Sequence, residues 1–172
     1  MLRTKTSWAL ALSSIAMLAL AVPAFAQESQ LDLHGSFSVT TASHTKSWGA
    51  GIGGQFTFGP TSAPLRLSLS PSFDYLKQQS SGPSQEILSI DASVQPGGSS
   101  TITPYVGASA SANWSSGSGK QWEGSKLGLE LLGGAQIKLG SSPATLKAEE
   151  RFGYVEDQEH TLTTRVGVLL KL

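Results

Sequence analysis

The stretch of residues 65–75 reads LRLSLSPSFDY and decides the fold class. Its apolar side chains fall on odd positions from Leu65 to Tyr75, whereas Arg66, the serines and Asp74 fall on even positions. Neighbouring side chains of a β-strand point to opposite faces. This period of two therefore predicts a strand with one apolar face and one polar face.

The same period of two recurs in seven further segments of the chain. They are residues 31–40, 48–58, 88–94, 102–114, 127–139, 145–154 and 162–172. The sequence therefore predicts an all-β protein with eight antiparallel strands. Strands of about nine to fourteen residues are longer than those usual in soluble sheets, and they match tilted strands that cross a bilayer.

The connections between these segments are of two alternating kinds. Residues 59–64, 95–101 and 140–144 are compact and combine proline with glycine or serine, which is typical of turns. Residues 43–47, 77–86, 115–126 and 156–161 are generally longer and carry charged side chains, which is typical of solvated loops. Short turns at one end and longer loops at the other predict an eight-stranded up-and-down transmembrane β-barrel, with both ends of the mature chain at the turn end.

The composition narrows the class of protein further. The chain has 172 residues, no cysteine, and 12 basic against 12 acidic side chains. This length fits one domain, and the absence of a basic excess argues against a nucleic-acid partner. Without cysteine the chain has no disulfide, no thiolate zinc site and no cysteine nucleophile.

The N-terminus has the pattern of a secretory signal peptide. Arg3 and Lys5 precede an almost wholly apolar run over residues 8–22, which is followed by Ala24-Phe25-Ala26. That run is shorter than the roughly 20 residues that a membrane-spanning helix needs, and the small-x-small triplet fits a cleavage site. We therefore expect residues 1–26 to be a cleaved signal peptide and residues 27–172 to be the exported barrel domain.

The alternate positions that form the polar face of the predicted strands carry a nearly balanced set of acidic and basic residues. An inward-facing set inside a narrow barrel has to be paired, because an unpaired buried charge is costly, so we expect a barrel-interior ionic network. Its predicted members are Asp32, Arg66, Asp74, Asp91, Glu130, Lys138, Lys147, Glu149, Arg151, Arg165 and Lys171. Glycines of the same parity, such as Gly49, Gly51 and Gly53, would make room for these long side chains. The alternative is a soluble lipocalin-like barrel whose apolar parity points inward and binds a ligand.

Large aromatic residues gather at the loop ends of the predicted strands. Trp48, Tyr75, Trp114 and Tyr154 are expected to form a girdle at one membrane interface. Glu150 is the exception to the pattern, because it falls on the lipid-facing parity near the middle of its strand. Either the register differs locally, or the side chain is protonated, re-aimed by a bulge, or in contact with a partner.

Two short segments resemble known outer-membrane sequences. Residues 164–172, TRVGVLLKL, resemble the C-terminal assembly signal of bacterial outer-membrane proteins, with Val166, Val168, Leu170 and Leu172 at alternate positions and leucine where an aromatic residue is typical. Residues 104–110, PYVGASA, are similar to a strand start of small barrels of the OmpA/OmpX type. The resemblance implies a location in the bacterial outer membrane, contact with its lipid and lipopolysaccharide, and insertion by the barrel-assembly machinery.

The sequence favours a structural role over catalysis. His34 and Ser36 share one strand face as a base and a nucleophile would, but they lie near the turn end and point inward. His160 has acidic neighbours in its loop, Glu156, Asp157 and Glu159, which are expected to be solvated rather than to bind a metal. We therefore predict a monomeric, closed, non-enzymatic barrel without cofactor or metal, whose loops carry an envelope or surface-interaction role. The alternatives are a narrow porin-like channel for small solutes and the soluble ligand-binding barrel.

Overall fold

The computed structural model describes residues 26–40, 44–79, 84–116, 126–156 and 160–172. They form eight strands: β1 (Glu28–Thr40), β2 (Lys46–Phe58), β3 (Leu65–Gln78), β4 (Ser84–Pro96), β5 (Ile102–Ser116), β6 (Lys126–Lys138), β7 (Ala144–Val155) and β8 (His160–Lys171). The predicted eight strands are confirmed. The predicted signal peptide lies outside the described residues except for Ala26. No helix in the described part of the chain is long and apolar enough to cross a membrane.

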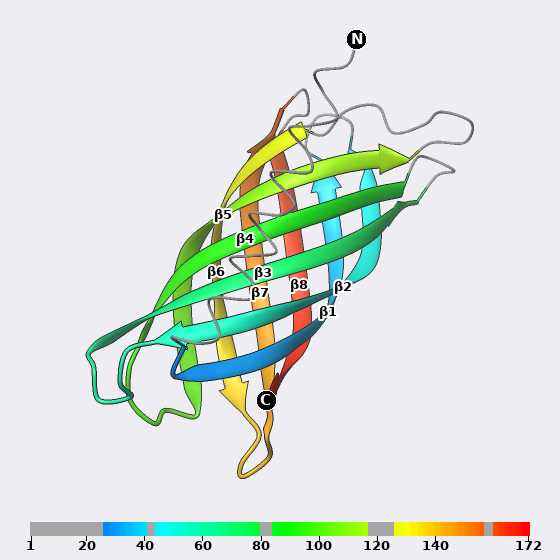
Figure 1. Ribbon diagram of the computed structural model, residues 1–172. Helices are drawn as coiled ribbons and strands as arrows, with labels where there is room; N and C mark the ends of the chain where they lie inside the picture. Colours follow the sequence, from blue (N-terminus) through cyan, green and yellow to red (C-terminus); the bar gives the residue numbers. More distant parts are fainter. Residues whose placement is uncertain (1–25, 41–43, 80–83, 117–125, 157–159) are drawn as a thin grey trace, which may run out of the picture.

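The strands close into a barrel (Figure 1). Each strand pairs antiparallel with the next along the chain, and β1 also pairs antiparallel with β8. Leu33, for example, is paired with Ile52 of β2 on one side and with Val168 of β8 on the other. Because the sheet closes on itself, it has no edge strand with unpaired backbone groups.

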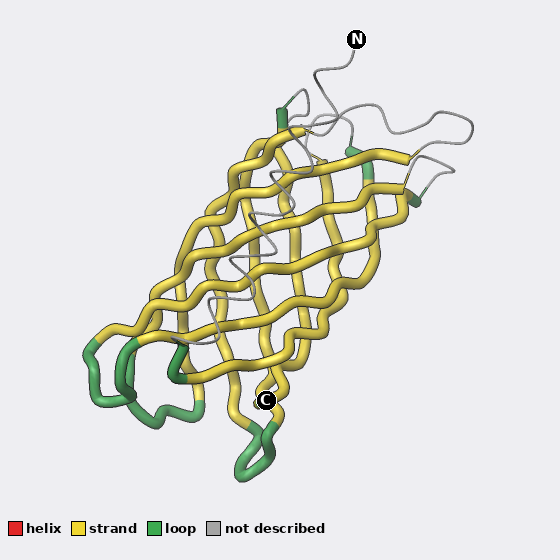
Figure 2. Tube along the Cα trace, in the orientation of Figure 1, coloured by secondary structure: helices red, strands yellow, loops and turns green. Residues whose placement is uncertain are grey.

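The barrel has a turn end and a loop end, as the connections predicted. Residues 59–64, 97–101 and 139–143 form the short connections drawn in green at the lower end in Figure 2. Gly59 and Gly140 adopt positive φ angles of 92° and 60° in these turns, which a glycine adopts without a steric penalty. The amide of Leu172 donates to the carbonyl of Ser29, so the start of β1 and the C-terminus meet at the turn end.

At the loop end several strands are longer than predicted. β3 runs to Gln78 and β4 begins at Ser84, so the loop expected at 77–86 shortens to 79–83. Side chains beyond the aromatic girdle no longer need to be apolar, and the alternation that marks a membrane-facing strand fades there. The backbone ladder continues all the same, since Lys77 is still paired with Ser84.

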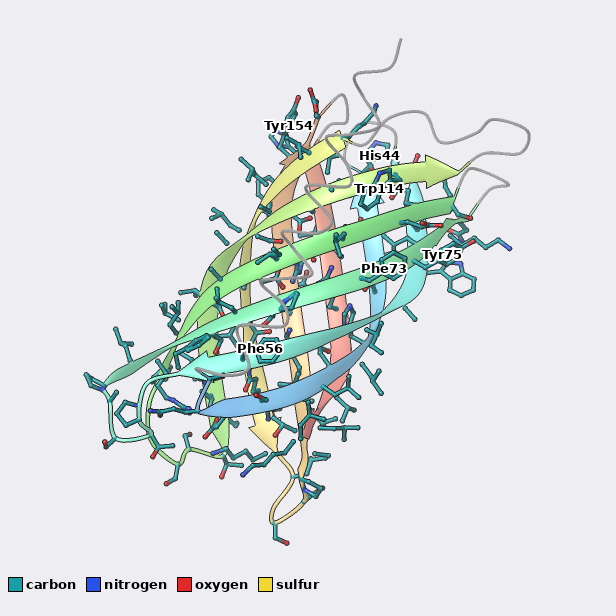
Figure 3. The ribbon with its side chains drawn as sticks, in the orientation of Figure 1. His44, Phe56, Phe73, Tyr75, Trp114 and Tyr154 are labelled. Atoms are coloured by element: carbon teal, nitrogen blue, oxygen red, sulfur yellow. The ribbon has the colours of Figure 1, made fainter. Side chains whose placement is uncertain are left out.

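The two faces of the sheet have the polarity expected of a membrane-spanning barrel. Apolar side chains such as those of Phe73 and Tyr75 project outward from the barrel (Figure 3). Leu131 is 69% exposed and Val166 is 60% exposed. Inward-facing polar side chains are buried, and Asp74 and Arg151 are each only 1% exposed. The alternative of a soluble barrel with its apolar parity inside is therefore wrong.

Candidate functional site in the barrel lumen

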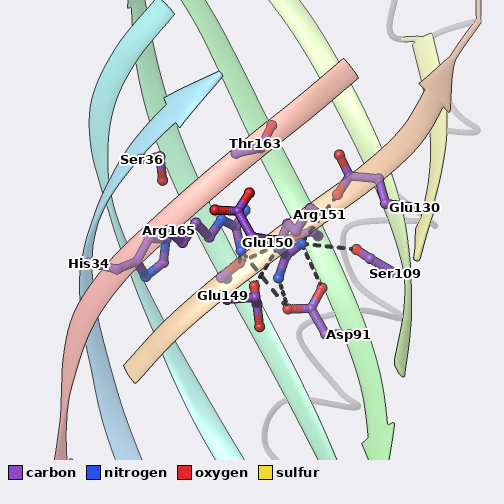
Figure 4. Close-up of polar contacts among 12 residues, drawn as sticks. His34, Ser36, Asp91, Ser109, Glu130, Glu149, Glu150, Arg151, Thr163 and Arg165 are labelled. Carbon is purple, nitrogen blue, oxygen red and sulfur yellow. Dashed lines mark hydrogen bonds and ion pairs between the residues drawn. The ribbon is translucent and has the colours of Figure 1, made fainter. Parts of the chain in front are cut away.

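The lumen is filled by one continuous network of ionic side chains. Eight of the eleven predicted members take part in it: Asp32, Asp74, Asp91, Glu130, Lys147, Glu149, Arg151 and Arg165. They project inward from six different strands, so the contacts cross the lumen rather than following one strand (Figure 4).

Arg151 of β7 is the centre of this network. Its guanidinium forms a two-pronged ion pair with Asp91 of β4, in which Nη1 donates to Oδ1 at 3.1 Å and Nη2 donates to Oδ2. Its Nε donates to Glu149, and Nη1 also reaches Glu130 at 3.3 Å. One buried cation thus compensates three carboxylates, using the fixed fork of donors that arginine provides.

A second cluster surrounds Asp74 of β3. This carboxylate accepts hydrogen bonds from Arg165 Nη2 at 2.6 Å, Ser36 Oγ at 2.8 Å and His34 Nε2 at 2.9 Å. The other ring nitrogen of His34, Nδ1, lies 3.1 Å from Asp32 Oδ1. An ionised carboxylate only accepts, so both hydrogen bonds of His34 require a proton on each ring nitrogen.

Lys147 connects the two clusters. Its Nζ lies 3.0 Å from Asp32 Oδ2 and 3.5 Å from Glu149 Oε2. Tyr105 supports the same junction, because its hydroxyl donates to Glu149 at 2.9 Å and its ring centroid lies 5.9 Å from Lys147 Nζ. Arg165 adds a longer contact to Asp91, at 3.9 Å.

Small residues of the inward parity create the space for this network. A Cβ atom built on Gly51 would lie 2.4 Å from His34 Nε2 and 2.9 Å from the Asp74 carboxylate, and one on Gly153 would lie 2.5 Å from Glu130 Cγ. A Cβ atom built on Gly49 or Gly53 would instead meet mainly backbone atoms of the neighbouring strand β3, such as the Tyr75 carbonyl oxygen. Gly51 therefore accommodates long side chains as expected, whereas Gly49 and Gly53 permit close strand approach.

Three predicted members lie apart from the network, at the turn end. Arg66 pairs there with Glu28 at 3.2 Å and donates to the Gly59 carbonyl. The prediction was wrong for Lys138 and Lys171: both are exposed, and neither forms an ion pair with a side chain that the structure describes. Each is the last residue of its strand, where the barrel opens to solvent and a charge needs no protein partner.

The sequence-based set omitted several lumen residues. His34, Ser36, Tyr105 and Ser109 all contact the network. The signal that could have identified them is their parity: Tyr105 alternates with Pro104 and Val106 and shares its face with Thr103 and Gly107. Selecting Asp, Glu, Lys and Arg alone excluded the histidine, serine and tyrosine side chains that hydrogen-bond to the network.

The residues considered for catalysis are not arranged as a nucleophile and base. The Ser36 hydroxyl donates to Asp74, and the His34 ring contacts Asp32 and Asp74. Both side chains are buried in the lumen. At the loop end His160 stacks on Phe152 with ring centroids 5.5 Å apart, while Asp157 and Glu159 lie outside the described residues.

The predicted interface aromatics lie at the loop end of the outer surface. Tyr75, Trp114 and Tyr154 are labelled there in Figure 3, and Trp48 is the register partner of Lys77 in the same zone. Trp48, Tyr75 and Tyr154 are exposed, and Trp114 is half-buried. At the other end of β8, Val166, Val168, Leu170 and Leu172 of the predicted C-terminal assembly signal alternate along the outer face.

Glu150 faces outward from the middle of β7 in the predicted register. It is paired with Gly133 of β6 and Thr164 of β8, and its side chain is exposed. The Thr164 hydroxyl lies 2.8 Å and 3.0 Å from the two carboxylate oxygens. Neither a locally shifted register nor an inward-turning bulge therefore accounts for this residue.

Replacing Glu150 with leucine is expected to stabilise the barrel in a lipid bilayer by about 1–2 kcal/mol, since a carboxylate in hydrocarbon is unfavourable. Urea unfolding in liposomes measures the change. The matched control is Glu86→Leu, because Glu86 has the outward parity but lies at the loop end; its effect should stay within about 0.5 kcal/mol. A loss of stability in Glu150→Leu alone would contradict the placement of Glu150 in hydrocarbon.

The geometry defines a class of protein: a membrane-spanning, eight-stranded antiparallel barrel whose lumen is crossed by a network of ion pairs. No protein-family model matches the chain, and no curated protein matches it in sequence. Solved structures do match. The Neisserial surface protein A is similar with a TM-score of 0.62 and 20% identity, covering 84% of this chain and 96% of that one.

Two further structures share the fold. Ail, the attachment invasion locus protein of Yersinia pestis, has a TM-score of 0.58 and 16% identity over 84% of this chain and 98% of its own. The outer-membrane enzyme PagL has a TM-score of 0.50 and 8% identity over 82% and 99%. The chain therefore has the fold of small outer-membrane β-barrels.

Proposed function

We propose that this chain is an integral outer-membrane protein without enzymatic activity, whose sealed barrel holds its loops at the cell surface for envelope integrity or surface contact. The observation that carries the proposal is the ionic network across the lumen. Arg151 bridges β4, β6 and β7, and Arg165 joins β8 to β3. An eight-stranded barrel is just wide enough for side chains, so such a network leaves no continuous water path.

Two observations support a role carried by the loops rather than by a catalytic site. Ser36 is held by Asp74 and not by His34, so the pair lacks the contact that would activate a hydroxyl. Two proteins of the same fold are described as a surface protein and an attachment protein. The proposed surroundings are outer-membrane lipid and lipopolysaccharide, the proposed assembly route is the barrel-assembly machinery, and the proposed state is a monomer.

The first test combines location with folding. Cell fractionation should place the mature chain in the outer membrane, and the detergent-folded protein should migrate differently in electrophoresis with and without boiling. Reconstitution into planar bilayers should give no single-channel conductance. Discrete conductance steps would instead favour a narrow pore, and a soluble product with no mobility shift would contradict the membrane location.

The second test separates the loops from the barrel. Residues 117–125 connect β5 to β6, whose described pairing reaches Asn113 and Lys126. Replacing residues 117–125 with Asn-Gly leaves a connection of five residues between the register partners Asn113 and Lys126. Hairpins commonly have loops of this length, so the heat-dependent mobility should stay unchanged. Surface attachment or detergent resistance of the producing cells should fall. Unchanged phenotypes after shortening of all four loops would contradict the proposed role.

A further inference from the structure

The turn end of the barrel contains a polar cavity that the ionic network does not use. Its volume is about 210 Å³. Its lining includes three basic side chains, Arg66, Lys138 and Lys171, and one carboxylate, Glu28. The formal charge of this lining is therefore +2. The cavity is large enough for several water molecules at about 30 Å³ each, or for one small hydrated anion.

A hydrogen bond across the lumen lies beside the cavity. Gln136 lines the cavity, and its Nε2 donates to Gln55 Oε1 at 3.1 Å. Gln136 is also the register partner of Lys147, so this bond lies where the cavity meets the ionic network. The cavity is therefore a vestibule at the turn end of the barrel.

Two residues that line the cavity each have a buried polar atom with no hydrogen-bond partner among the described residues. These atoms are Nη2 of Arg66 and Oε1 of Gln95. Both side chains are only 6% exposed, both line the cavity, and they are register partners on β3 and β4. Leaving a buried donor or acceptor unsatisfied is unfavourable, so native structures usually provide it with a partner.

We propose that this vestibule binds inorganic hydrogen phosphate. Gly59 and Glu28 accept hydrogen bonds from Nε and Nη1 of Arg66, and a small rotation of the side chain would turn the buried Nη2 towards a phosphate oxygen in the cavity. Lys138 and Lys171 are exposed bases at the rim and supply the remaining positive charge. Arginine and lysine are the side chains that recognise phosphate oxygens.

The unsatisfied oxygen of Gln95 selects the kind of anion. Hydrogen phosphate at neutral pH keeps an O–H group that can donate to this oxygen. Sulfate has only acceptor oxygens, and a phosphomonoester has largely lost its last proton at this pH. With the Gln95 amide in its present orientation, either ion would place an acceptor against an acceptor. The site should therefore prefer free phosphate to both.

Binding is independent of the proposed role of the loops; only the exposure of the vestibule to the periplasm rests on the proposed location. The test is a titration of the detergent-folded, isotope-labelled protein, followed by amide NMR shifts at constant ionic strength. The probes are sodium phosphate, glycerol 1-phosphate and sodium sulfate. Phosphate should produce saturable shifts in Gln95, Thr103 and Thr145, with an affinity at least about tenfold higher than that of sulfate, equivalent to 1.4 kcal/mol.

Variants assign the effect to the vestibule. The double substitution Lys138→Gln and Lys171→Gln should weaken phosphate binding about tenfold or more, whereas Lys77→Gln, an exposed base at the loop end, should not change it. Gln95→Leu should bring the phosphate and sulfate affinities close together. Tighter binding of glycerol 1-phosphate than of phosphate would overturn the selection by Gln95. Equal, unsaturated shifts for all three probes, unchanged in the double variant, would overturn the site; the mobility test of the proposed function is unaffected by either result.

Discussion

Replacing Arg151 with methionine is expected to lower the free energy of unfolding of the folded barrel by about 3–5 kcal/mol, because the change removes one partner of a buried ionic group and leaves the others uncompensated. Arg151 is 1% exposed and contacts Asp91, Glu130 and Glu149. Methionine retains most of the side-chain volume, so the loss measures charge rather than a cavity. Urea unfolding in detergent or in liposomes gives the free energy.

Three further variants separate the charge of Arg151 from its geometry. Arg151→Lys keeps the charge but loses the two-pronged contact with Asp91, and an intermediate loss is expected. Adding Asp91→Asn to Arg151→Met should recover part of the loss, since one fewer carboxylate is left unpaired. Lys77→Met removes an exposed base and should change stability by less than about 0.5 kcal/mol. A barrel that is equally stable with methionine at position 151 would contradict the ionic closure of the lumen.

The strands and their faces could be predicted from the sequence because a membrane barrel obeys a strict local rule. Every membrane-spanning strand has lipid on one side and a narrow lumen on the other. Whether a residue faces lipid or the lumen therefore follows from its odd or even position along the strand. The stretch Leu65–Tyr75 illustrates this, since its odd positions all face outward in β3. A soluble sheet imposes weaker constraints, and the same reading would leave the two faces ambiguous.

The strand ends and the loop-end extensions could not be predicted in the same way. Above the girdle, Lys77 and Gln78 remain paired although nothing in their polarity distinguishes strand from loop. Pairing there depends on the neighbouring strand, which a single stretch of sequence does not contain. The same limitation explains Lys138 and Lys171, whose parity is inward but whose height in the barrel places them in solvent.

The ion pairs within the lumen also could not be predicted from the alternation of residues along each strand. The sequence indicates that Asp91 and Arg151 both face inward, but they are 60 positions apart and their contact depends on the relative height of β4 and β7. Strand register sets that height, and register follows from closure of the whole sheet. His34 shows the complementary case, since its inward parity was visible while its two aspartate partners, one of them on β3, were not.

The most direct test of the outward face is to introduce a charged residue at a position that faces lipid. Val166→Arg is expected to destabilise the barrel in liposomes by about 2–4 kcal/mol, because Val166 lies in the middle of β8 and arginine at the bilayer midplane is costly. Leu65→Arg is the matched control: Leu65 is 64% exposed against 60% for Val166, but it begins β3 at the turn end. There the same substitution should cost only about 0–1 kcal/mol.

The similar solvent exposure of Leu65 and Val166 makes these two variants decisive. If the apolar face met water, both substitutions would replace an exposed apolar side chain with a solvated one, and both would change stability by less than about 0.5 kcal/mol. A depth-dependent difference between Val166→Arg and Leu65→Arg arises only if hydrocarbon surrounds the middle of the barrel. Urea unfolding of both variants in liposomes, with the retained heat-dependent mobility shift as evidence of folding, therefore measures the environment of the outer face directly.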